Sequence, residues 1–210
     1  MHAAVLPSGC SILSRRLLTL QSCLKPFQLC NLSTLDDHQK KIYDRIIRID
    51  HAGEFGADRI YAGQMFVLGK TDVGPLIQHM WDQEKHHLQT FKDMISKHRS
   101  RPTVLLPLWN IAGFALGAGT ALISKEAAMA CTVAVEDTIT KHYNMQIRKL
   151  LELNGDHDEL LSTIKKFRDE EMEHHDIGLE QNAEAAPAYD ILKKTIQMGC
   201  SAAIFLSERI

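Results

Sequence analysis

Two copies of one short motif constrain the fold of this chain more than any other feature of the sequence. Both have the form Asp-x-Glu-x-x-His, at residues 82–87 and again at 169–174, within long runs of helix-forming residues. Side chains three positions apart lie on the same face of an α-helix, so the Glu and His of each copy are able to bind one metal ion together. A single Glu-x-x-His means little, because both residue types are common on surfaces. Two copies indicate two helices that present matching ligands to one centre.

The repeat extends beyond these motifs. When Glu54 is aligned with Glu136, two further positions match, Tyr61 with Tyr143 and Gln64 with Gln146. In each copy the leading Glu precedes the Glu-x-x-His by roughly 30 to 35 residues, the length of one helix, a turn and a returning helix. We therefore predict two helical hairpins, at about 42–99 and 125–185, whose ligands face one another.

The repeat selects the candidate ligands of a paired metal site. Four carboxylates in a bundle core are strongly unfavourable unless their charge is compensated. Two divalent cations would balance the four negative charges, and two imidazoles would each add a neutral nitrogen. This set of oxygen and nitrogen ligands favours iron or manganese. The predicted ligands are Glu54, Glu84, His87, Glu136, Glu171 and His174.

Several polar residues near these ligands have open roles. Tyr61 and Tyr143 lie two helical turns beyond the leading Glu of their copy; core packing with a hydrogen-bonded hydroxyl is favoured, and a redox or proton-relay role is the alternative. Asp50 and Asp58 flank Glu54 by one turn, so either could orient a ligand histidine, or serve on the surface or as a cap. The roles of His51 and His142 are left open. His86 and His175 are expected to face away from the site.

The first 35 residues differ from the rest of the chain. Residues 1–35 contain no Asp or Glu but include Arg15, Arg16, Lys25 and many Ser and Thr residues. This composition is typical of a mitochondrial transit peptide. A disordered tail is the alternative, and a secretory signal fits less well because the two arginines interrupt the apolar stretch. We assign residues 36–210 to the folded domain.

Overall composition excludes some classes of protein. The formal net charge of −2 and the lack of a basic run argue against nucleic-acid binding. The 5 cysteines form no Cys-x-x-Cys pair, which argues against a disulfide scaffold.

The pattern of helix formers and breakers predicts an all-α chain. Capping residues, glycines and prolines set the expected boundaries. The first expected helix runs from Asp36 or Asp37 to about Leu68, before Gly69, and the second follows the turn at 71–75 and ends at about His98. The third runs from Lys125 to near Asn154–Gly155, and the fourth from Asp156 or Asp158 to about Ala185. The last covers Tyr189–Ser207.

An uncharged segment joins the two predicted hairpins. Residues 102–124 are long enough to span a bilayer, but their prolines and glycines favour a helix on a membrane surface or a buried crossover. Gly113-x-x-x-Gly117 predicts a close helix contact. Residues 195–207 are also uncharged and could form a second membrane-facing element, or both segments could pack on the bundle. The expected architecture is a ferritin-like four-helix bundle with an apolar crossover helix and an apolar C-terminal helix.

These residues resemble a known family, the demethoxyubiquinone hydroxylases of ubiquinone biosynthesis in their mitochondrial form. The resemblance covers essentially all of residues 36–210. It rests on Arg48-Ile49-Asp50-His51-Ala52-Gly53-Glu54, on Glu84-x-x-His87, on Glu136, on Phe167-Arg168-Asp169-Glu170-Glu171-x-x-His174-His175, and on Leu206-Ser207-Glu208-Arg209.

The resemblance implies a di-iron monooxygenase that lies peripherally on the matrix side of the mitochondrial inner membrane. Such an enzyme uses O₂ and electrons from NADH to hydroxylate the ring of a polyprenylated demethoxyubiquinol, the penultimate step of ubiquinone biosynthesis. It implies two iron ions held by the same six ligands, and a lipid-binding accessory protein within a complex of ubiquinone-biosynthesis enzymes. No residues for binding NADH are indicated.

Three other functions compete with this one. They are another membrane-associated di-iron oxidase such as a quinol oxidase, a ferritin-like iron-binding protein without catalysis, and a helical scaffold without metal. The apolar segments weaken the iron-storage alternative, which predicts a hydrophilic outer shell. The four inward carboxylates weaken the scaffold alternative, because they would lack compensation.

Overall fold

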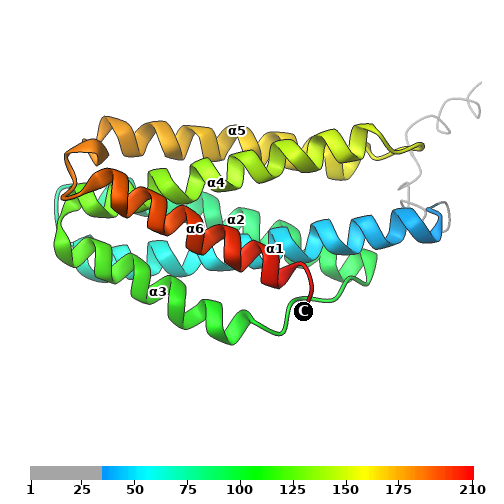
Figure 1. The fold of residues 1–210 in the computed structure, drawn as a ribbon, viewed down its shortest axis with the longest axis horizontal. Helices are drawn as coiled ribbons and strands as arrows, with labels where there is room; N and C mark the ends of the chain where they lie inside the picture. The colour runs from blue at the N-terminus through cyan, green and yellow to red at the C-terminus, as the bar shows by residue number, and fades with distance from the viewer. Residues whose placement is uncertain (1–34) are drawn as a thin grey trace, which may run out of the picture. The chain divides into compact units, whose positions relative to one another are not determined.

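The computed structural model describes residues 35–210, and every regular element in this part of the chain is helical (Figure 1). This confirms the predicted all-α class. The elements are α1 Asp37–Leu68, α2 Gly74–His98, α3 Leu106–Ile123, α4 Lys125–Leu151, α5 Asp158–Glu180, the 3₁₀ turn η2 Ala183–Ala185 and α6 Tyr189–Ser207.

Four of these helices form the bundle and two lie outside it. Helix α1 packs against α2 and α4 packs against α5, so the chain forms two hairpins. Helix α3 lies along α1 and leads into α4, while α6 packs on α4 (Figure 1). The long connection through α3 between two hairpins is the arrangement of ferritin-like bundles.

The helix boundaries follow local capping chemistry in part. Asp36 caps α1 by accepting a hydrogen bond from the Gln39 backbone N–H at 2.8 Å, and the Gln39 side chain accepts one from Asp36 in return. Ser124 caps α4 in a similar way. Helix α5 ends at Glu180, earlier than the predicted Ala185, because Asn182 adopts a left-handed conformation with φ of 63° and turns the chain into η2. Helix α4 likewise ends at Leu151, short of the predicted Asn154–Gly155.

Glycines bring the crossover helix into backbone contact with the bundle. A Cβ added at Gly117 would lie 1.9 Å from the Ile60 carbonyl oxygen, and one at Gly63 would lie 2.3 Å from the Phe114 carbonyl oxygen. Gly113 is similarly close to α1, where a Cβ would meet the Gly56 carbonyl oxygen at 2.9 Å. The predicted close contact at Gly113-x-x-x-Gly117 is therefore confirmed, and its partner is α1.

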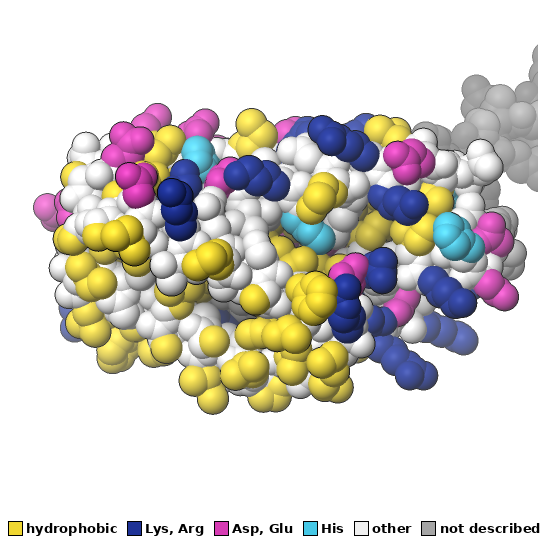
Figure 2. Space-filling view, in the orientation of Figure 1, with side chains coloured by type: hydrophobic (Ala, Val, Ile, Leu, Met, Phe, Trp, Pro, Cys, Tyr) yellow, Lys and Arg dark blue, Asp and Glu magenta, His cyan; other side chains and the backbone are white. Residues whose placement is uncertain are grey.

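The outer faces of α3 and α6 carry many exposed apolar side chains. Helix α3 is the one described helix whose length and composition would allow it to cross a membrane, with a mean hydropathy of 1.5, and only 22% of it is buried. Figure 2 shows hydrophobic side chains gathered over this part of the surface. The most exposed on the two helices are Leu108, Ile111, Leu122, Ile123, Ile191, Met198 and Phe205.

The two larger of the three buried apolar clusters have a polar layer between them. One cluster includes Leu68, Ile77 and Met129, and the other includes Ile47, Phe91 and Ile164. On α1, α2 and α4 the predicted ligands fall in sequence between the residues of the two clusters. This order brings the ligands to one level of the bundle.

Candidate metal centre

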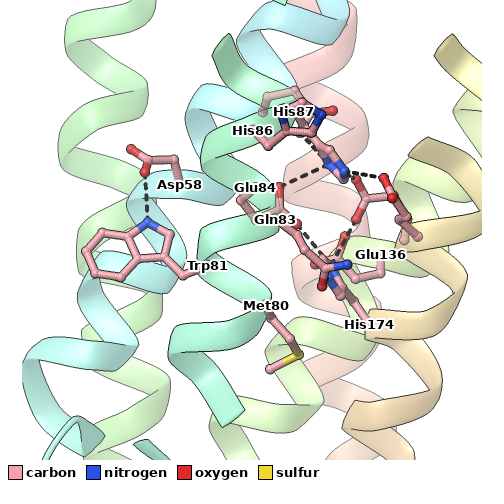
Figure 3. Close-up of polar contacts among 12 residues, drawn as sticks. Asp58, Met80, Trp81, Gln83, Glu84, His86, His87, Glu136 and His174 are labelled. Carbon is pink, nitrogen blue, oxygen red and sulfur yellow. Dashed lines mark hydrogen bonds and ion pairs between the residues drawn. The ribbon is translucent and has the colours of Figure 1, made fainter. Parts of the chain in front are cut away.

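The structure brings all six predicted ligands together in the middle of the bundle (Figure 3). Helices α1 and α4 each supply one carboxylate, and α2 and α5 each supply a Glu-x-x-His pair on one helix face. Every one of the six side chains is buried, with 0 to 3% of its surface exposed. The residues are Glu54, Glu84, His87, Glu136, Glu171 and His174.

The ligands form two overlapping groups. One consists of Glu54, Glu84, His87 and Glu171, and the other of Glu84, Glu136, Glu171 and His174; within each group one ligand atom from every residue lies within 4.8 Å of the others. Glu84 and Glu171 belong to both groups. If two cations were bound, these two carboxylates would lie next to both of them, whereas each remaining residue would lie next to one.

Both histidines turn the same ring nitrogen toward the centre. His87 Nδ1 lies 3.1 Å from Glu171 Oε1 and 3.5 Å from Glu54 Oε2. His174 Nδ1 lies 3.1 Å from Glu84 Oε1 and 3.3 Å from Glu171 Oε2. In each imidazole Nδ1 is thus the atom that faces the four carboxylates of the cluster, and Nε2 points away from these four.

Unpartnered polar atoms show that these residues fit a pair of metal ions. Buried polar atoms normally have a hydrogen-bond partner, and leaving one without is costly. Among the described residues, six buried atoms of the cluster have none: Glu54 Oε2, Glu84 Oε1 and Oε2, Glu136 Oε2, Glu171 Oε2 and His174 Nδ1. Coordination to divalent cations would satisfy all six and would neutralise the acidic cluster.

Electrostatics within the cluster couple proton binding to metal binding. Burial and, next in size, the negative charge of Glu171 together raise the pKa of Glu84 to about 8. Burial opposes a charge on His87, but the close carboxylates of Glu171 and Glu54 raise its pKa to about 12. In the same way the close carboxylates of Glu171 and Glu84 outweigh burial at His174 and raise its pKa to about 10. Protons and metal ions therefore compete for these groups.

The two tyrosines bond to the leading carboxylate of the opposite repeat. The Tyr61 hydroxyl donates to Glu136 Oε1 at 3.1 Å, and the Tyr143 hydroxyl donates to Glu54 Oε1. Both rings are buried at 1% exposure. The favoured interpretation of a buried, hydrogen-bonded tyrosine is confirmed, and the bond partner is a ligand. A redox or proton-relay role stays a prediction.

Neither of the two roles left open for Asp50 and Asp58 is seen in the structure, where both side chains are buried in the interior of α1. Asp50 and Asp58 were candidates to orient a ligand histidine, but Asp50 accepts a hydrogen bond from Gln146 Nε2 at 2.6 Å and Asp58 accepts one from Trp81 Nε1 at 2.8 Å (Figure 3). Asp50 thus bonds to a side chain of α4 and Asp58 to a side chain of α2, and not to the imidazole of His87 or His174.

The other histidines take up separate positions. His142 lines the pocket beside Glu54 and bonds to Gln146, whereas His51 is buried on α1. His86 is exposed, and His175 contacts Asp176, so the prediction that both face away from the ligands is confirmed.

The residues that do contact the outer nitrogens were missed. His87 Nε2 lies 2.8 Å from Glu170 Oε2, and His174 Nε2 lies 2.9 Å from Gln83 Oε1. A signal for them existed in the repeat, because Gln83 and Glu170 align with each other and each directly precedes a bridging Glu. The sequence shows this register but not that each side chain crosses to the opposite hairpin.

An apolar cavity lies beside the ligands. It has a volume of about 380 Å³ and is lined by residues of α1, α3, α4 and α6. A pocket of about 20 Å³ against the carboxylates shares part of its lining with the cavity. The shared residues are Ile49, Gly53, Ala57, Ile139 and Ile204. The cavity therefore lies between the carboxylate cluster and helices α3 and α6, which carry the exposed apolar residues.

Comparison with known proteins identifies relatives over most of the chain. Residues 41–207 match the family described as ubiquinone biosynthesis protein COQ7. The chain is 65% identical over 178 residues to the human NADPH-dependent 3-demethoxyubiquinone 3-hydroxylase, mitochondrial, covering 84% of this chain and 82% of that protein. It is 44% identical over 220 residues to the Saccharomyces cerevisiae 5-demethoxyubiquinone hydroxylase, mitochondrial, covering 96% and 94%. A bacterial relative, the Rhodospirillum rubrum 3-demethoxyubiquinol 3-hydroxylase, is 48% identical over 177 residues, covering 83% and 82%.

Proposed function

This chain belongs to the family of the ubiquinone biosynthesis protein COQ7, and we propose that it hydroxylates the ring of a polyprenylated demethoxyubiquinol with O₂. In ubiquinone biosynthesis this is the penultimate step. The observation that carries the proposal is the convergence of six buried Glu and His ligands beside an apolar cavity. The mitochondrial location in the names of the human and yeast relatives applies here as well.

The proposed cofactor is a pair of iron ions. Glu84 and Glu171 would bridge the pair, Glu54 with His87 would complete one position, and Glu136 with His174 would complete the other. When bound, two Fe(II) ions supply electrons for the reduction of O₂. The protein holds the ligands in place through the Tyr61 and Tyr143 hydrogen bonds and excludes bulk water from a buried site.

The proposed substrate position is the apolar cavity. A volume of about 380 Å³ lies within the range of ligand pockets in general. The ring would lie at the end of the cavity that meets the carboxylates, and the first part of the prenyl tail would extend between α3 and α6. Apolar walls suit a tail that has no polar groups to satisfy.

The exposed apolar faces of α3 and α6 support a membrane-peripheral position. We place the chain on the matrix side of the inner membrane, with these faces in the lipid. The prenyl tail of the substrate would then enter the cavity from the membrane. The predicted transit peptide, residues 1–35 with their acid-free composition, lies outside the described residues except for Leu35. The domain boundary at 36, the two repeats at 42–99 and 125–185, and association with a lipid-binding accessory protein and other ubiquinone-biosynthesis enzymes belong to the same proposal.

The source of electrons is proposed as a reduced nicotinamide cofactor. Sequence reasoning named NADH, whereas the names of the animal relatives include NADPH. Initial rates with each cofactor at equal concentration, measured on the purified protein, decide between them. A clear preference for NADPH would overturn the NADH expectation.

Isotope labelling tests the reaction itself. The purified, iron-loaded chain is incubated with demethoxyubiquinol and ¹⁸O₂, and the quinone product is analysed by mass spectrometry. One ¹⁸O atom in the ring is expected. Consumption of O₂ with unlabelled quinone would identify a quinol oxidase instead, and many iron ions per chain without turnover would favour iron storage.

Two glycines provide a matched test of the cavity. Gly199 lines the cavity, and Gly119 does not; a Cβ added at either meets no heavy atom within 4 Å. We expect Gly199→Leu to lower kcat/KM for a polyprenyl substrate by about tenfold or more, because the leucine side chain would fill space that the substrate occupies. Gly119→Leu serves as the control and should keep wild-type kinetics. Equal kinetics in both variants would place the substrate elsewhere.

A further inference from the structure

The two halves of the ligand cluster repeat each other, except at one position. Gln83 directly precedes Glu84 in the first hairpin, and Glu170 directly precedes Glu171 in the second. Each side chain reaches the histidine of the other hairpin: Gln83 Oε1 lies 2.9 Å from His174 Nε2 (Figure 3), and Glu170 Oε2 lies 2.8 Å from His87 Nε2. The contact is thus the same in both halves, but one acceptor is an amide and the other a carboxylate.

These contacts fix how each imidazole is presented. Nδ1 of both rings faces the cluster at 3.1 Å from a bridging carboxylate oxygen. A neutral imidazole that binds a metal through Nδ1 carries its proton on Nε2, and that N–H must then be donated. Both rings are fully buried, so Glu170 and Gln83 provide acceptors where bulk water does not reach, and the hydrogen bond sets the orientation of the ring.

A carboxylate and an amide acceptor do not have the same effect on the ring. A hydrogen bond to an ionised acceptor is stronger than one to a neutral oxygen. It draws the Nε2 proton away from the ring and makes Nδ1 a better electron donor to a metal. The neutral amide oxygen of Gln83 does this less. The other oxygen of the Glu170 carboxylate, Oε1, lies 3.6 Å from Lys166 Nζ, and the Glu170 side chain is 24% exposed.

We propose that Glu170 and Gln83 are positioning residues that make the two metal positions unequal. The position completed by Glu54 and His87 binds a divalent cation more tightly and fills first. The position completed by Glu136 and His174 binds more weakly and fills second. This inference rests on the proposed two-metal site, and it concerns how the protein distinguishes the two ions within a nearly symmetric set of ligands.

Stepwise metal binding to the full chain tests the inference. Co²⁺ is titrated into the apoprotein and followed by its visible absorption, and anaerobic ⁵⁷Fe²⁺ loading is followed by Mössbauer spectroscopy. Removing an outer partner of a metal-bound histidine typically costs 10- to 100-fold in affinity. The wild type should therefore show two classes of site that differ by about tenfold or more, and one equivalent of ⁵⁷Fe²⁺ should give mainly one quadrupole doublet.

Exchange of the two acceptors gives the decisive comparison. Glu170→Gln should weaken the tighter site until the two affinities agree within about threefold, whereas Gln83→Glu should tighten the weaker one. The double exchange should restore two unequal sites. Glu173→Gln removes one negative charge from an exposed position on the same helix and is expected to keep both wild-type affinities. Circular dichroism confirms that each variant is folded.

The outcomes separate this inference from the proposed function. A Glu170→Gln protein that binds two ions with wild-type affinities would overturn the inference and leave the two-metal site intact. Equal weakening of both sites would also overturn it, because only the His87 position should respond. A wild-type chain that binds no pair of cations would overturn the proposed function as well.

Discussion

Glu84 and Glu171 differ from the other carboxylates of the site because each belongs to both ligand groups. Loss of either therefore affects both metal positions, while loss of Glu54 or Glu136 affects one. In this structure both shared carboxylates are the Glu of a Glu-x-x-His motif, so the motif marks in the sequence the two residues that would touch both ions.

We expect Glu171→Ala to remove nearly all bound iron and Glu136→Ala to remove about half, in line with two bridged positions sharing ligands. Both should abolish turnover. Inductively coupled plasma spectrometry on the purified variants measures the occupancy, with Glu173→Ala as a control for loss of acidic charge on α5. Full iron content with retained turnover in Glu171→Ala would show that the bridging assignment is wrong.

His51 makes stability depend on pH. Burial and the positive charge of Lys92 lower the pKa of His51 to about 4, so the unfolded chain binds a proton at this residue from about pH 6.5 downward while the folded chain does not. Stability should therefore fall as pH decreases from about 6.5 to 4. In His51→Gln this contribution is absent, and the difference in Tm between the two proteins should change over that interval. A constant difference would contradict the assignment.

At the scale of helices, the contact between α1 and α3 depends on missing side chains. We expect Gly117→Ala to destabilise the fold by at least about 1–3 kcal/mol, as for other overpacked sites, because its Cβ would lie 1.9 Å from the Ile60 carbonyl oxygen. Gly119→Ala on the same helix meets no atom within 4 Å and should be neutral or stabilising by up to about 1 kcal/mol. Urea unfolding measures both, and equal stability of the two variants would contradict the contact.

Helix positions and ligands were predictable because both depend on local periodicity. Asp36 and Ser124 cap helices where the pattern begins, and the repeat placed Glu54 and Glu136 at matching levels of the bundle. The end of α5 was not predictable, because it depends on the left-handed backbone of Asn182. An asparagine can adopt this conformation or remain helical, so its presence alone does not mark the end of a helix. The Glu170 and Gln83 contacts depend on packing between hairpins, and no local pattern in one helix encodes which side chain crosses to its neighbour.

At the scale of the whole domain, the apolar faces of α3 and α6 should govern membrane binding. Ile111 is 69% and Leu122 74% exposed on α3. Replacing both by Ser should lower the apparent affinity for vesicles of inner-membrane lipid composition by about 10- to 100-fold, as expected when two apolar side chains no longer enter the lipid. Vesicle flotation measures this.

The control for the membrane prediction lies on another helix. Leu151 ends α4 and is 62% exposed, so Leu151→Ser removes a comparable apolar surface outside the predicted binding face. It should float with vesicles as the wild type does. Equal loss in both proteins would show that general hydrophobicity, and not the α3 and α6 face, causes the binding.

The layer of buried acids between two apolar clusters also has a consequence for the lifetime of the chain in a cell. Cations that bind only the folded state stabilise it by mass action, and here they also offset the repulsion among carboxylates drawn from all four bundle helices. If the proposed iron pair is the bound group, a shortage of iron would leave more chains open at this layer, where they would become substrates for proteases. Iron supply would then set the amount of the protein as well as the fraction of its sites that hold iron, and a shortage of the metal would lower the amount of the chain itself.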